Sequence, residues 1–500
     1  MTLLLVVPDG VGVRNFVLGS FLREAGERGR VVALHVVPDE LLPTYAQDAP
    51  GVEWERLPRT ASGRMAETLA NALAYAHMNW AGTRAMRRRL GAPMHTPTLG
   101  RWAMVRTARA IGRVASSRRG IAVLSGAHGM VASRSATVSE FRRRFEELQP
   151  SVLFCSHQRP PEIIAPALAA RSLGIPTATF IFSWDNLTSK GRIAAPFDHY
   201  LVWSAQMRDE LLRYYPDVSA DRVHIVGTPQ FDPHTDERLH WSREELFTRL
   251  GADPARKLIC FSGGDVGTCP DDAGHVAILM EHVRAGRIPG NPQVVLRPAP
   301  VDSGARYEPV RARYPELIYA PAEWVHVRPG NWARVMPLPG DVAFLANLTR
   351  HADVNVNTAS TMTLDFAIHD RPVVNLAFDV TTPPPLGKPL WEVYYQYEHY
   401  RPVVELGAAR IARSAEELAT HVSAYLANPA LDREARRKLV ELEVSLPLGR
   451  SSERILDVLE RIAASRRGAP AVSARRVGAA AGAGARTGAG AGAKAGAGAG

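Results

Sequence analysis

One polar loop in the first half of the chain carries side chains that could do acid–base and phosphate chemistry. The segment FSWDNLTSKGR, residues 182–192, follows the apolar run IPTATFIF, which is typical of a buried strand. Its candidate members are Trp184, Asp185, Asn186, Thr188 and Lys190. A carboxylate here could act as a general base, since that role needs only a hydrogen-bonding side chain of suitable pKa and placement. The alternative is an Asx turn formed by Asp185 and Asn186, with Trp184 packed nearby.

Two further turns place polar residues after apolar runs. VPDGVGVRNF puts Asp9 and a glycine-rich turn after the first run, and FCSHQRPPE puts His157 and Arg159 after a later one. The residues behind the first turn that could contact a substrate or a phosphate are Arg14 and Asn15. A lone histidine is more often structural than catalytic, but ligands of open α/β sheets bind beyond the carboxyl ends of the strands. We expect Asp9, His157 and Asp185 to converge on one cleft if the sheet order is as expected.

A strand–turn–helix pattern in the second half of the chain could bind a phosphate. In DVNVNTASTMTLDFAIHDRPVVNLAFD, residues 353–379, small hydroxyl residues precede a predicted helix. The free N–H groups and the dipole of a helix start favour anions, so a diphosphate could dock beside Thr358, Ser360 and Thr361. Asp365, one turn later, could accept hydrogen bonds from a ribose. The alternative is an ordinary helix cap without a ligand, and a solvated Asp365.

No metal-binding motif occurs in the sequence: it contains no Asp-x-Asp, no His-Glu-x-x-His and no Cys-x-x-Cys. CFSGGDVGTCPDD is glycine-rich like a phosphate loop, but it lacks the Lys-Ser/Thr of a P-loop and the spacing of a dinucleotide fingerprint. We therefore predict chemistry without a metal or a cofactor. Phosphate charge would be stabilised by Arg297, Lys190, hydroxyl groups and helix N-termini.

Strands and helices that could position these turns alternate along most of the chain. Six β-rich runs (LLLVV, VVALHVV, VLFC, TATFIF, YLVW and VHIV) are followed by four more (KLICFSGG, QVVLRP, DVNVN and PVVNLAFD). Helices are expected near 271–285, 340–351 and 360–369. Such alternation indicates βαβ units, so we predict an α/β fold with two doubly wound, Rossmann-like domains.

The alternation is interrupted twice, which suggests domain boundaries. FDPHTDERLHWSREELF is typical of a connection, and the chain ends in an Ala/Gly repeat that cannot bury apolar surface. The predicted units are 1–235 (N-terminal domain), 236–255 (linker), 256–390 (C-terminal domain), 391–465 (C-terminal helices) and 466–500 (disordered, basic, Gly/Ala-rich tail). The tail could be an electrostatic tether, but we favour a segment without a function.

Composition places the chain among ordinary globular proteins. It has 500 residues, enough for two or three domains, with 46% hydrophobic and 22% charged residues. Three cysteines, Cys155, Cys260 and Cys269, form no paired framework, so we expect a reduced, cytosolic protein. MTLLLVV reaches Pro8 too soon for a signal peptide, and no run of 18 apolar residues predicts a membrane span.

The positive charge of the chain is local. Six of the ten net positive charges lie in residues 466–500, and eleven arginines with no acidic residue lie between Glu67 and Glu140. In the predicted helix LGRWAMVRTARAIGRVA, the basic face holds Arg106, Arg109 and Arg113, and the apolar face holds Ala103, Met104, Ile111 and Val114.

An anionic membrane surface would suit the basic stretch Arg84–Arg119, which also contains Trp102. A solvated basic face is the alternative. We do not expect nucleic acid as a partner, because no recognition motif occurs.

Segment 353–379 resembles the nucleotide-binding βα unit of GT-B glycosyltransferases. It is similar to that of CDP-glycerol glycerophosphotransferases and bacterial surface-polysaccharide transferases, in which a small-hydroxyl pair opens the helix and Pro-Val and Phe-Asp follow. HIVGTPQFDPH, residues 224–234, resembles their Gly-x-Pro-x-Phe-Asp element before the interdomain linker. With the loop at 182–192, the resemblance covers roughly residues 150–380. It implies a GT-B architecture: an acceptor-side first domain, a nucleotide-donor second domain facing it across a cleft, and terminal helices that cross back.

The same resemblance implies roles for individual residues. Relatives carry Trp-His-Gly-Thr-Pro-x-Lys where this chain has residues 182–192, so Asp185 replaces a histidine thought to be the base and Lys190 would steady negative charge. The implied donor-binding residues are Ser360, Thr361, Thr358, Asp365, Arg297, Gly263, Gly264 and Thr268. The implied acceptor or phosphate contacts are Trp184, Asn186, Thr188, Lys190, Arg14 and Asn15.

One departure concerns a histidine of the relatives. They often carry Arg-x-His-Pro after the second strand of the donor domain, whereas this chain reads LRPAPVD. Arg297 could still neutralise a donor phosphate, but Ala299 takes the place of the histidine. The candidates to supply its contribution are His326 and His351.

Three functions are compatible with these observations. The first is a transferase that moves a sugar or polyol phosphate from a nucleotide-activated donor to an acceptor hydroxyl, with Asp185 as the preferred base and Asp9 and His157 as competitors. The acceptor would be a surface polysaccharide or its lipid carrier, met at the inner face of the cell membrane. The second is an isomerase similar to UDP-sugar 2-epimerases, and the third is a catalytically silent binding module of the same fold.

Overall fold

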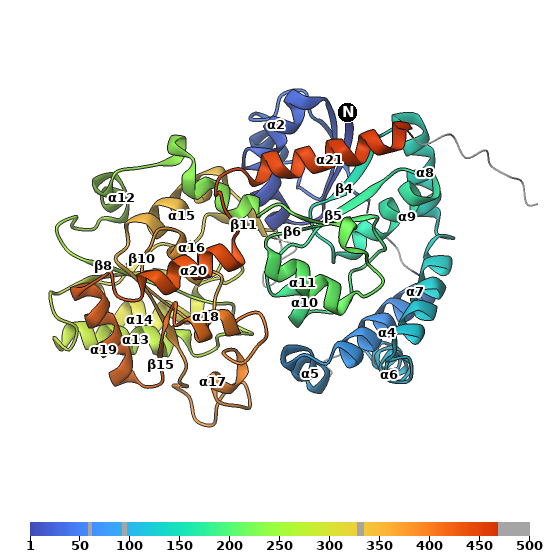
Figure 1. Ribbon diagram of the computed structural model, residues 1–500. Helices are drawn as coiled ribbons and strands as arrows, with labels where there is room; N and C mark the ends of the chain where they lie inside the picture. The colour runs from blue at the N-terminus through green and yellow to red at the C-terminus, as the bar shows by residue number, and fades with distance from the viewer. Residues whose placement is uncertain (59–62, 93–97, 328–334, 469–500) are drawn as a thin grey trace, which may run out of the picture.

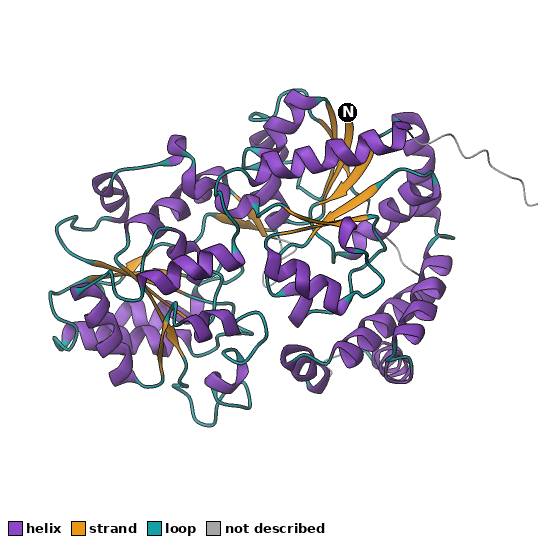
Figure 2. Cartoon of the chain, in the orientation of Figure 1, coloured by secondary structure: helices purple, strands orange, loops and turns teal. Residues whose placement is uncertain are grey.

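The computed structural model describes residues 1–58, 63–92, 98–327 and 335–468. Two parallel β-sheets with helices packed against them form an N-terminal and a C-terminal domain (Figure 1; Figure 2). The predicted α/β fold with two Rossmann-like domains is confirmed. Among the described residues, no helix is long and apolar enough to cross a membrane.

The first sheet has the strand order β3-β2-β1-β4-β5-β6-β7, and all neighbouring strands are parallel. Its strands are β1 (Thr2–Val7), β2 (Arg30–His35), β3 (Glu53–Arg56), β4 (Val152–Cys155), β5 (Thr177–Phe180), β6 (His199–Val202) and β7 (Val223–Ile225). Only β3 is missing from the predicted runs, because this edge strand reads EWER and buries none of its residues fully. The order reverses between β1 and β4, and in such folds ligands bind in the crevice beyond these two strands.

Helices connect the strands of this domain. They are α1 (Gly10–Gly12), η1 (Val13–Val17), α2 (Phe21–Arg28), α3 (Leu42–Ala46), α8 (Ala136–Leu148), η2 (Pro161–Ile163), α9 (Ile164–Ser172), α10 (Asn186–Ser189), α11 (Ala205–Tyr214) and η3 (Ala220–Arg222). An α-helical insertion projects from the domain between β3 and β4 (Figure 1). It consists of α4 (Arg64–Ala81), α5 (Arg84–Gly91), α6 (Leu99–Val114) and α7 (Arg118–Ala132).

The insertion has a small core of its own. Ala72 and Ala76 of α4 pack with Ala108 of α6, and a side chain on Gly112 would collide with Tyr75, so the two helices touch closely. The predicted faces of α6 are partly wrong. Arg109 turns toward Tyr75 and the Ala92 carbonyl, while Val114, expected on the packed side, is 90% exposed. Which face of a helix is buried depends on the elements that pack against it, and not only on the spacing of its apolar residues.

The second sheet has the order β10-β9-β8-β13-β14-β15, which repeats the arrangement of the first. Its parallel strands are β8 (Leu258–Ser262), β9 (Gln293–Arg297), β10 (Ile318–Tyr319), β13 (Val354–Asn357), β14 (Val373–Leu376) and β15 (Arg410–Ala412). An antiparallel hairpin, β11 (Trp324–His326) and β12 (Val335–Pro337), lies outside it. The crevice of this sheet lies beyond β8 and β13, where the glycine-rich loop and the hydroxyl-rich turn begin.

The remaining elements revise the predicted boundaries. They are η4 (Pro229–Thr235), η5 (Glu237–Leu239), α12 (Arg243–Leu250), α13 (Asp272–Arg284), η6 (Ala305–Tyr307), α14 (Glu308–Arg313), α15 (Pro339–His351), α16 (Met362–Ile368), α17 (Leu390–Val393), α18 (Arg401–Leu406), α19 (Ala415–Ala427), α20 (Arg433–Glu443) and α21 (Ser451–Gly468). The linker 236–255 contains α12, and β15 extends the second domain past residue 390. The predicted tail starts inside α21, and its part from 469 onward lies outside the described residues.

The C-terminal helix joins the two domains. From the end of α20, the chain returns to the first domain, where α21 lies beside α2 (Figure 1). Arg28 of α2 forms an ion pair with Asp457 at 2.6 Å. Asp232 in η4 accepts hydrogen bonds from the N–H groups of Ser451 and Ser452 at the start of α21. This crossing is the one that the resemblance implied.

Candidate active site

The crevice of the first sheet contains a carboxylate–imidazole pair. Asp9 follows β1 and caps α1, where its Oδ1 accepts the Gly12 N–H at 2.8 Å. His157 follows the neighbouring strand β4, and its Nδ1 lies 2.5 Å from Oδ2 of Asp9. The imidazole ring stacks on Phe182, with 4.0 Å between ring centroids. Backbone, carboxylate and aromatic ring together fix the orientation of His157.

The Asp9 carboxylate decides which nitrogen of His157 carries the proton. Burial acts to raise the pKa of Asp9, but the charge and hydrogen bond of His157 and two backbone N–H groups bring it below its ordinary value. The ionised carboxylate therefore accepts the Nδ1–H of His157. Nε2 of His157 is buried and has no hydrogen-bond partner among the described residues. This tautomer leaves a lone pair on Nε2 that could accept a proton.

Other buried polar atoms without a partner among the described residues lie near the crevices of both sheets. They are Nδ2 of Asn15, Nη1 of Arg297, Oγ1 of Thr358 and Nδ1 of His275. Each lies at the end of a strand or in the loop or helix that follows one. Buried polar groups in folded proteins are almost always hydrogen-bonded, so such a set indicates a place where a ligand supplies the missing partners.

The two domains touch through these same loops. Trp184, after β5 of the first domain, donates its indole N–H to Oγ1 of Thr361 in the second at 3.2 Å. Thr188 lies 3.0 Å from Nδ1 of His399. Gly10 packs so tightly on Val335 of the β12 hairpin that a side chain there would overlap the Val335 carbonyl. The carboxyl edges of the two sheets therefore face each other.

Asp185, the preferred base of the sequence prediction, is held as an ion. Its carboxylate accepts the Ser189 hydroxyl at 2.6 Å and the Asn186 side-chain amide at 2.9 Å, and Lys190 lies 3.4 Å away. Burial opposes ionisation, but Lys190, His399 and the hydroxyl donors lower the pKa of Asp185 far below its usual range. A carboxylate with so little proton affinity is a poor general base. The geometry favours His157 for that role.

The remaining loop residues serve mainly as contacts within the protein. Trp184, Asn186 and Thr188 are buried, and Oδ1 of Asn186 accepts the Gln158 side-chain amide at 3.0 Å. The backbone carbonyl of Thr188 accepts the Thr83 hydroxyl of the helical insertion. Of the predicted acceptor or phosphate contacts in this loop, only Lys190 is partly exposed.

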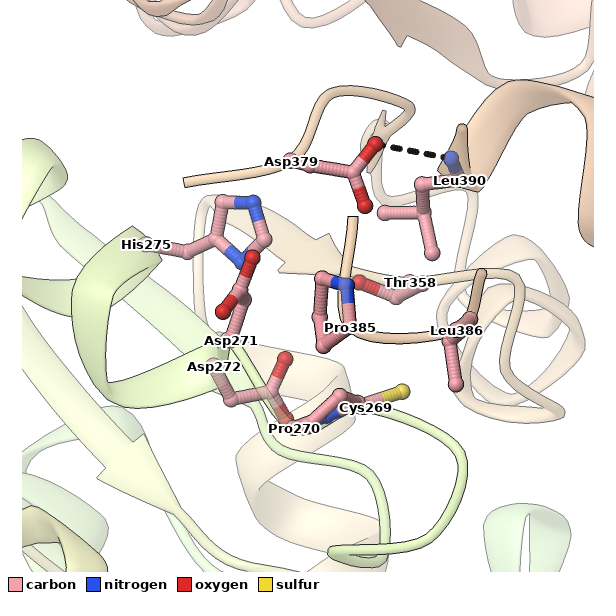
Figure 3. Close-up of a pocket in the computed structure, with 10 residues that line it drawn as sticks. All are labelled: Cys269, Pro270, Asp271, Asp272, His275, Thr358, Asp379, Pro385, Leu386 and Leu390. Carbon is pink, nitrogen blue, oxygen red and sulfur yellow. Dashed lines mark hydrogen bonds between the residues drawn. The ribbon is translucent and has the colours of Figure 1, made fainter. Parts of the chain in front are cut away.

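In the second domain, a small pocket opens beyond β8, β13 and β14 (Figure 3). Thr358 comes from the turn after β13, and His275 from α13. His275 donates Nε2–H to the Phe378 carbonyl at 2.8 Å, which leaves a lone pair on its unpartnered Nδ1. Asp379 accepts the Leu390 N–H at 3.0 Å. Burial raises the pKa of Asp272 to about 7, although Arg306 and the Gly264 N–H oppose it.

Most of the predicted donor-binding residues lie outside this pocket. Ser360 Oγ accepts the Met362 N–H at 3.2 Å and Thr361 bonds to Trp184, so these hydroxyls have partners already. Asp365 is buried and accepts Nε2–H of His234 in η4 at 3.0 Å. Gly263 and Gly264 have no room for a side chain, because Tyr307 and Cys269 pack against them, and Thr268 is exposed. Sequence reasoning missed His275, which nothing local marks. Asp379 was not among the predicted site residues, although it is the aspartate of the Phe-Asp pair that ends segment 353–379.

Two arginines from opposite domains provide positive charge between the pair and the pocket. Arg297 forms a buried ion pair with Asp341 at 2.7 Å, and its Nη1 has no partner among the described residues. Arg14 donates to Gln230 at 2.8 Å. Burial lowers the pKa of Arg14. The charges of Asp365 and Asp341 act in the opposite direction, and the charge of Arg297 lowers the pKa further.

The two histidines proposed to replace the one missing at Ala299 do not join the pair. His351 donates to the Trp241 carbonyl at 2.8 Å, and His326 lies on the β11 hairpin. No group of three or more His, Cys, Asp or Glu side chains in the described ranges could hold a metal ion.

Comparison with solved structures shows the fold. A UDP-GlcNAc 2-epimerase from Neisseria meningitidis bound to UDP-GlcNAc aligns with TM-score 0.52 and 11% identity, covering 92% of this chain and 100% of its own. A protein assigned as a UDP-N-acetylglucosamine 2-epimerase from Listeria monocytogenes aligns with TM-score 0.51 and 12% identity, covering 92% and 95%. The wall teichoic acid polymerase TagF aligns at TM-score 0.48 and 11% identity, covering 94% and 90%.

These epimerases share the GT-B fold, so the predicted GT-B architecture is confirmed. No family model matches the chain, and no curated protein matches it.

Proposed function

We propose that this protein is a GT-B glycosyltransferase that moves a sugar, or a polyol phosphate, from a nucleotide-activated donor to an acceptor hydroxyl, with His157 as general base. The observation that carries this proposal is the Asp9–His157 pair at the crevice of the first sheet, with a buried Nε2 that has no hydrogen-bond partner among the described residues. An oriented imidazole with a free lone pair is what deprotonation of an alcohol requires. Fold alone would not support this choice, since GT-B proteins differ in chemistry.

The proposed reaction follows from the charges around the pair. Nε2 of His157 takes the proton of the acceptor hydroxyl while the oxygen forms a bond to the transferred group, whose bond to the nucleotide phosphate breaks. The Asp9 carboxylate stabilises the imidazolium that forms. Arg14 and Arg297 lie where they could stabilise the negative charge on the leaving nucleotide. No metal or cofactor is part of this proposal.

We place one end of the nucleotide over the mouth of the small pocket of the second domain, whose interior has room for little more than one water molecule. Thr358 Oγ1 could donate, and His275 Nδ1 accept, one hydrogen bond each to the nucleotide. The pocket lies at the strand-order reversal of its sheet, where doubly wound folds bind ligands. The similar epimerase from Neisseria binds UDP-GlcNAc, which supports a nucleotide-sugar as the donor.

The acceptor we propose is membrane-associated, either a lipid carrier or a surface polysaccharide at the cytoplasmic face of the membrane. The exposed apolar residues of α6 and α7 include Leu99, Trp102, Val114, Val123 and Met130. The exposed arginines among them are Arg101, Arg106, Arg113, Arg118 and Arg119. A helical hairpin that exposes both apolar and basic side chains suits an anionic lipid surface.

A sugar-nucleotide isomerase is the second candidate, because two similar structures are 2-epimerases. Such an enzyme would need several free carboxylates around the sugar. In the described part of the cleft, the carboxylates Asp185, Asp341 and Asp365 are each bonded to a basic partner. The transferase is therefore the better-supported function.

Turnover assays on wild type, His157→Asn and the control His224→Asn test the proposal. UDP-GlcNAc and CDP-glycerol are incubated with and without lipid-extract acceptors, and nucleotide release and sugar conversion are measured. Acceptor-dependent nucleotide release that His157→Asn alone abolishes supports the transferase. Sugar conversion without acceptor supports the isomerase. A thermal shift with a nucleotide but no turnover supports a binding module of the same fold.

A further inference from the structure

The strongest unassigned feature lies beside the proposed base. Arg159 follows His157 by two residues, in the loop after β4. Its side chain is half-buried and forms no hydrogen bond or ion pair with any residue that the structure describes. A half-buried guanidinium without a protein partner keeps its donors available, so this arginine can bind an anion.

Backbone and amide contacts fix the position of Arg159. The neighbouring Gln158 donates to the Asn186 side chain and accepts the Phe182 N–H, both at 3.0 Å. The Gln158 carbonyl accepts the Ala194 N–H at 3.0 Å. The loops after β4 and β5 are thus hydrogen-bonded to each other through Gln158, the neighbour of Arg159, at three points on either side of residues 190–192.

The segments bonded to this loop carry three more cations. Lys190 and Arg192 come from the loop after β5, and Arg89 from α5, whose N-cap Thr83 bonds to that loop. Burial lowers the pKa of Arg159. The charge of Asp185 raises it, the charge of Arg89 lowers it further, and the charge of Asp9 raises it.

The nearby carboxylates do not neutralise these four cations. Asp185 is already paired with Lys190, and Asp9 with His157. Arg192 stacks over the Tyr215 ring at 5.1 Å, and neither Arg192 nor Arg89 forms an ion pair with a described residue. The neighbourhood thus keeps an excess of positive charge.

We propose that the acceptor carries a phosphate or diphosphate group, which Arg159 binds while the acceptor hydroxyl meets His157. This inference rests on the proposed function. Guanidinium groups bind phosphate through two parallel hydrogen bonds, which would also fix the acceptor relative to the base. The donor phosphates are assigned to Arg297 in the other domain, so the two phosphate sites are separate.

Binding of inorganic phosphate and pyrophosphate, measured by calorimetry without nucleotide, tests the site. We compare wild type with Arg159→Gln, Arg159→Lys and the control Arg134→Gln, which removes one exposed charge outside this cluster. We expect Arg159→Gln to weaken binding about tenfold or more, Arg159→Lys to retain part of it, and Arg134→Gln to match wild type. The Lys variant keeps the test valid if the Gln variant folds poorly.

Other outcomes of the same measurements would overturn the inference. Equal weakening in Arg159→Gln and Arg134→Gln would show only non-specific attraction to positive charge. Binding that Arg297→Gln abolishes and Arg159→Gln retains would assign the anion to the donor. The binding measurement needs no turnover, so its outcome does not depend on the proposed function. Phosphate binding in a protein without transferase activity would support the phosphate site and contradict the proposed function. Transfer to an acceptor without phosphate, unchanged in Arg159→Gln, would overturn the site alone.

Discussion

At the scale of residues, the proposed general base is His157 in its pair with Asp9, whereas the sequence favoured the single carboxylate of Asp185. Asp185 is near the cleft but is held ionised by Lys190 and His399. His157 combines a fixed ring with a free Nε2, and Asp9 holds its other nitrogen. The fixed ring, and the Nε2 atom without a partner among the described residues, are the geometric features that favour His157 as the base.

Replacing His157 by Asn should lower kcat about 10²-fold or more, because general base catalysis contributes roughly 10²–10⁴ in rate. Asp9→Asn should lower kcat by a comparable factor, because the Asn amide can donate to Nδ1 of His157 and so move the ring proton to Nε2. Acceptor-dependent nucleotide release measures both. Full activity of a correctly folded His157→Asn variant would show that another residue is the general base.

Glu443 of α20 should make stability fall with rising pH. Burial raises its pKa from an ordinary 4.5 to about 8, and its Oε1 has no partner among the described residues. The folded protein holds this proton up to about pH 8 whereas the unfolded chain releases it near pH 4.5, so stability declines as pH rises through that window.

Glu443→Gln should therefore raise the free energy of unfolding at pH 8.5 by on the order of 1–2 kcal/mol and change it little at pH 5. The control Glu441→Gln removes an exposed partner of Arg437 and should change it by less than about 1 kcal/mol at either pH. Denaturant unfolding at both pH values measures the effect. Equal stabilisation at both would show that packing, and not charge, is responsible.

At the scale of elements, helix α5 connects the insertion to the donor side. Arg88 of α5 donates to the Leu386 carbonyl at 2.8 Å, and Leu386 lines the pocket of the second domain. The N–H of Arg84 at the start of α5 donates to Glu398 at 3.0 Å. These bonds hold the loop that closes the pocket.

Arg88→Gln should therefore raise KM for the donor several-fold with a smaller change in kcat, since it loosens a pocket wall without touching the Asp9–His157 pair. Arg87→Gln on the same helix is the control, because Arg87 is exposed and its side chain has no hydrogen-bond or ion-pair partner among the described residues. Steady-state kinetics at varied donor concentration measures KM and kcat for each variant. An equal loss in both variants would point to the net charge of α5 instead.

At the scale of the whole molecule, the helical insertion extends away from both sheets (Figure 1). Its helices α6 and α7 expose both apolar and basic side chains. Arg106 stacks over Trp102 at 4.7 Å on this surface. The cleft lies between the domains, and α5 links the insertion to it. Helix α5 would thus connect a membrane contact on α6 and α7 to the pocket of the second domain.

The triple variant Trp102→Ser/Arg106→Glu/Arg113→Glu should lose binding to anionic vesicles that wild type retains at low salt. Arg142→Glu/Arg143→Glu on α8, also exposed, is the matched control and should bind nearly as wild type does. Co-sedimentation with vesicles containing phosphatidylglycerol, at two salt concentrations, measures this. Binding that the triple variant keeps would remove α6 from the contact.

The sequence by itself determined most strands, the helices near 272–284, 339–351 and 362–368, and the polar loops at the strand ends. These depend on hydrophobic period and turn chemistry, which act over a few residues. Strands β3 and β15 could not be found in this way, because a short or charged strand forms only where a neighbouring strand offers its hydrogen bonds.

The site itself was decided by the tertiary structure. Asp9 and His157 stand 148 residues apart and meet because β1 and β4 are neighbours in the sheet. Asp185 loses its proton affinity partly through His399, which comes from the other domain. The sequence of a loop indicates which residues are candidates for a site. The pKa of a candidate, and whether its polar atoms have hydrogen-bond partners, depend on residues that only folding brings close to it.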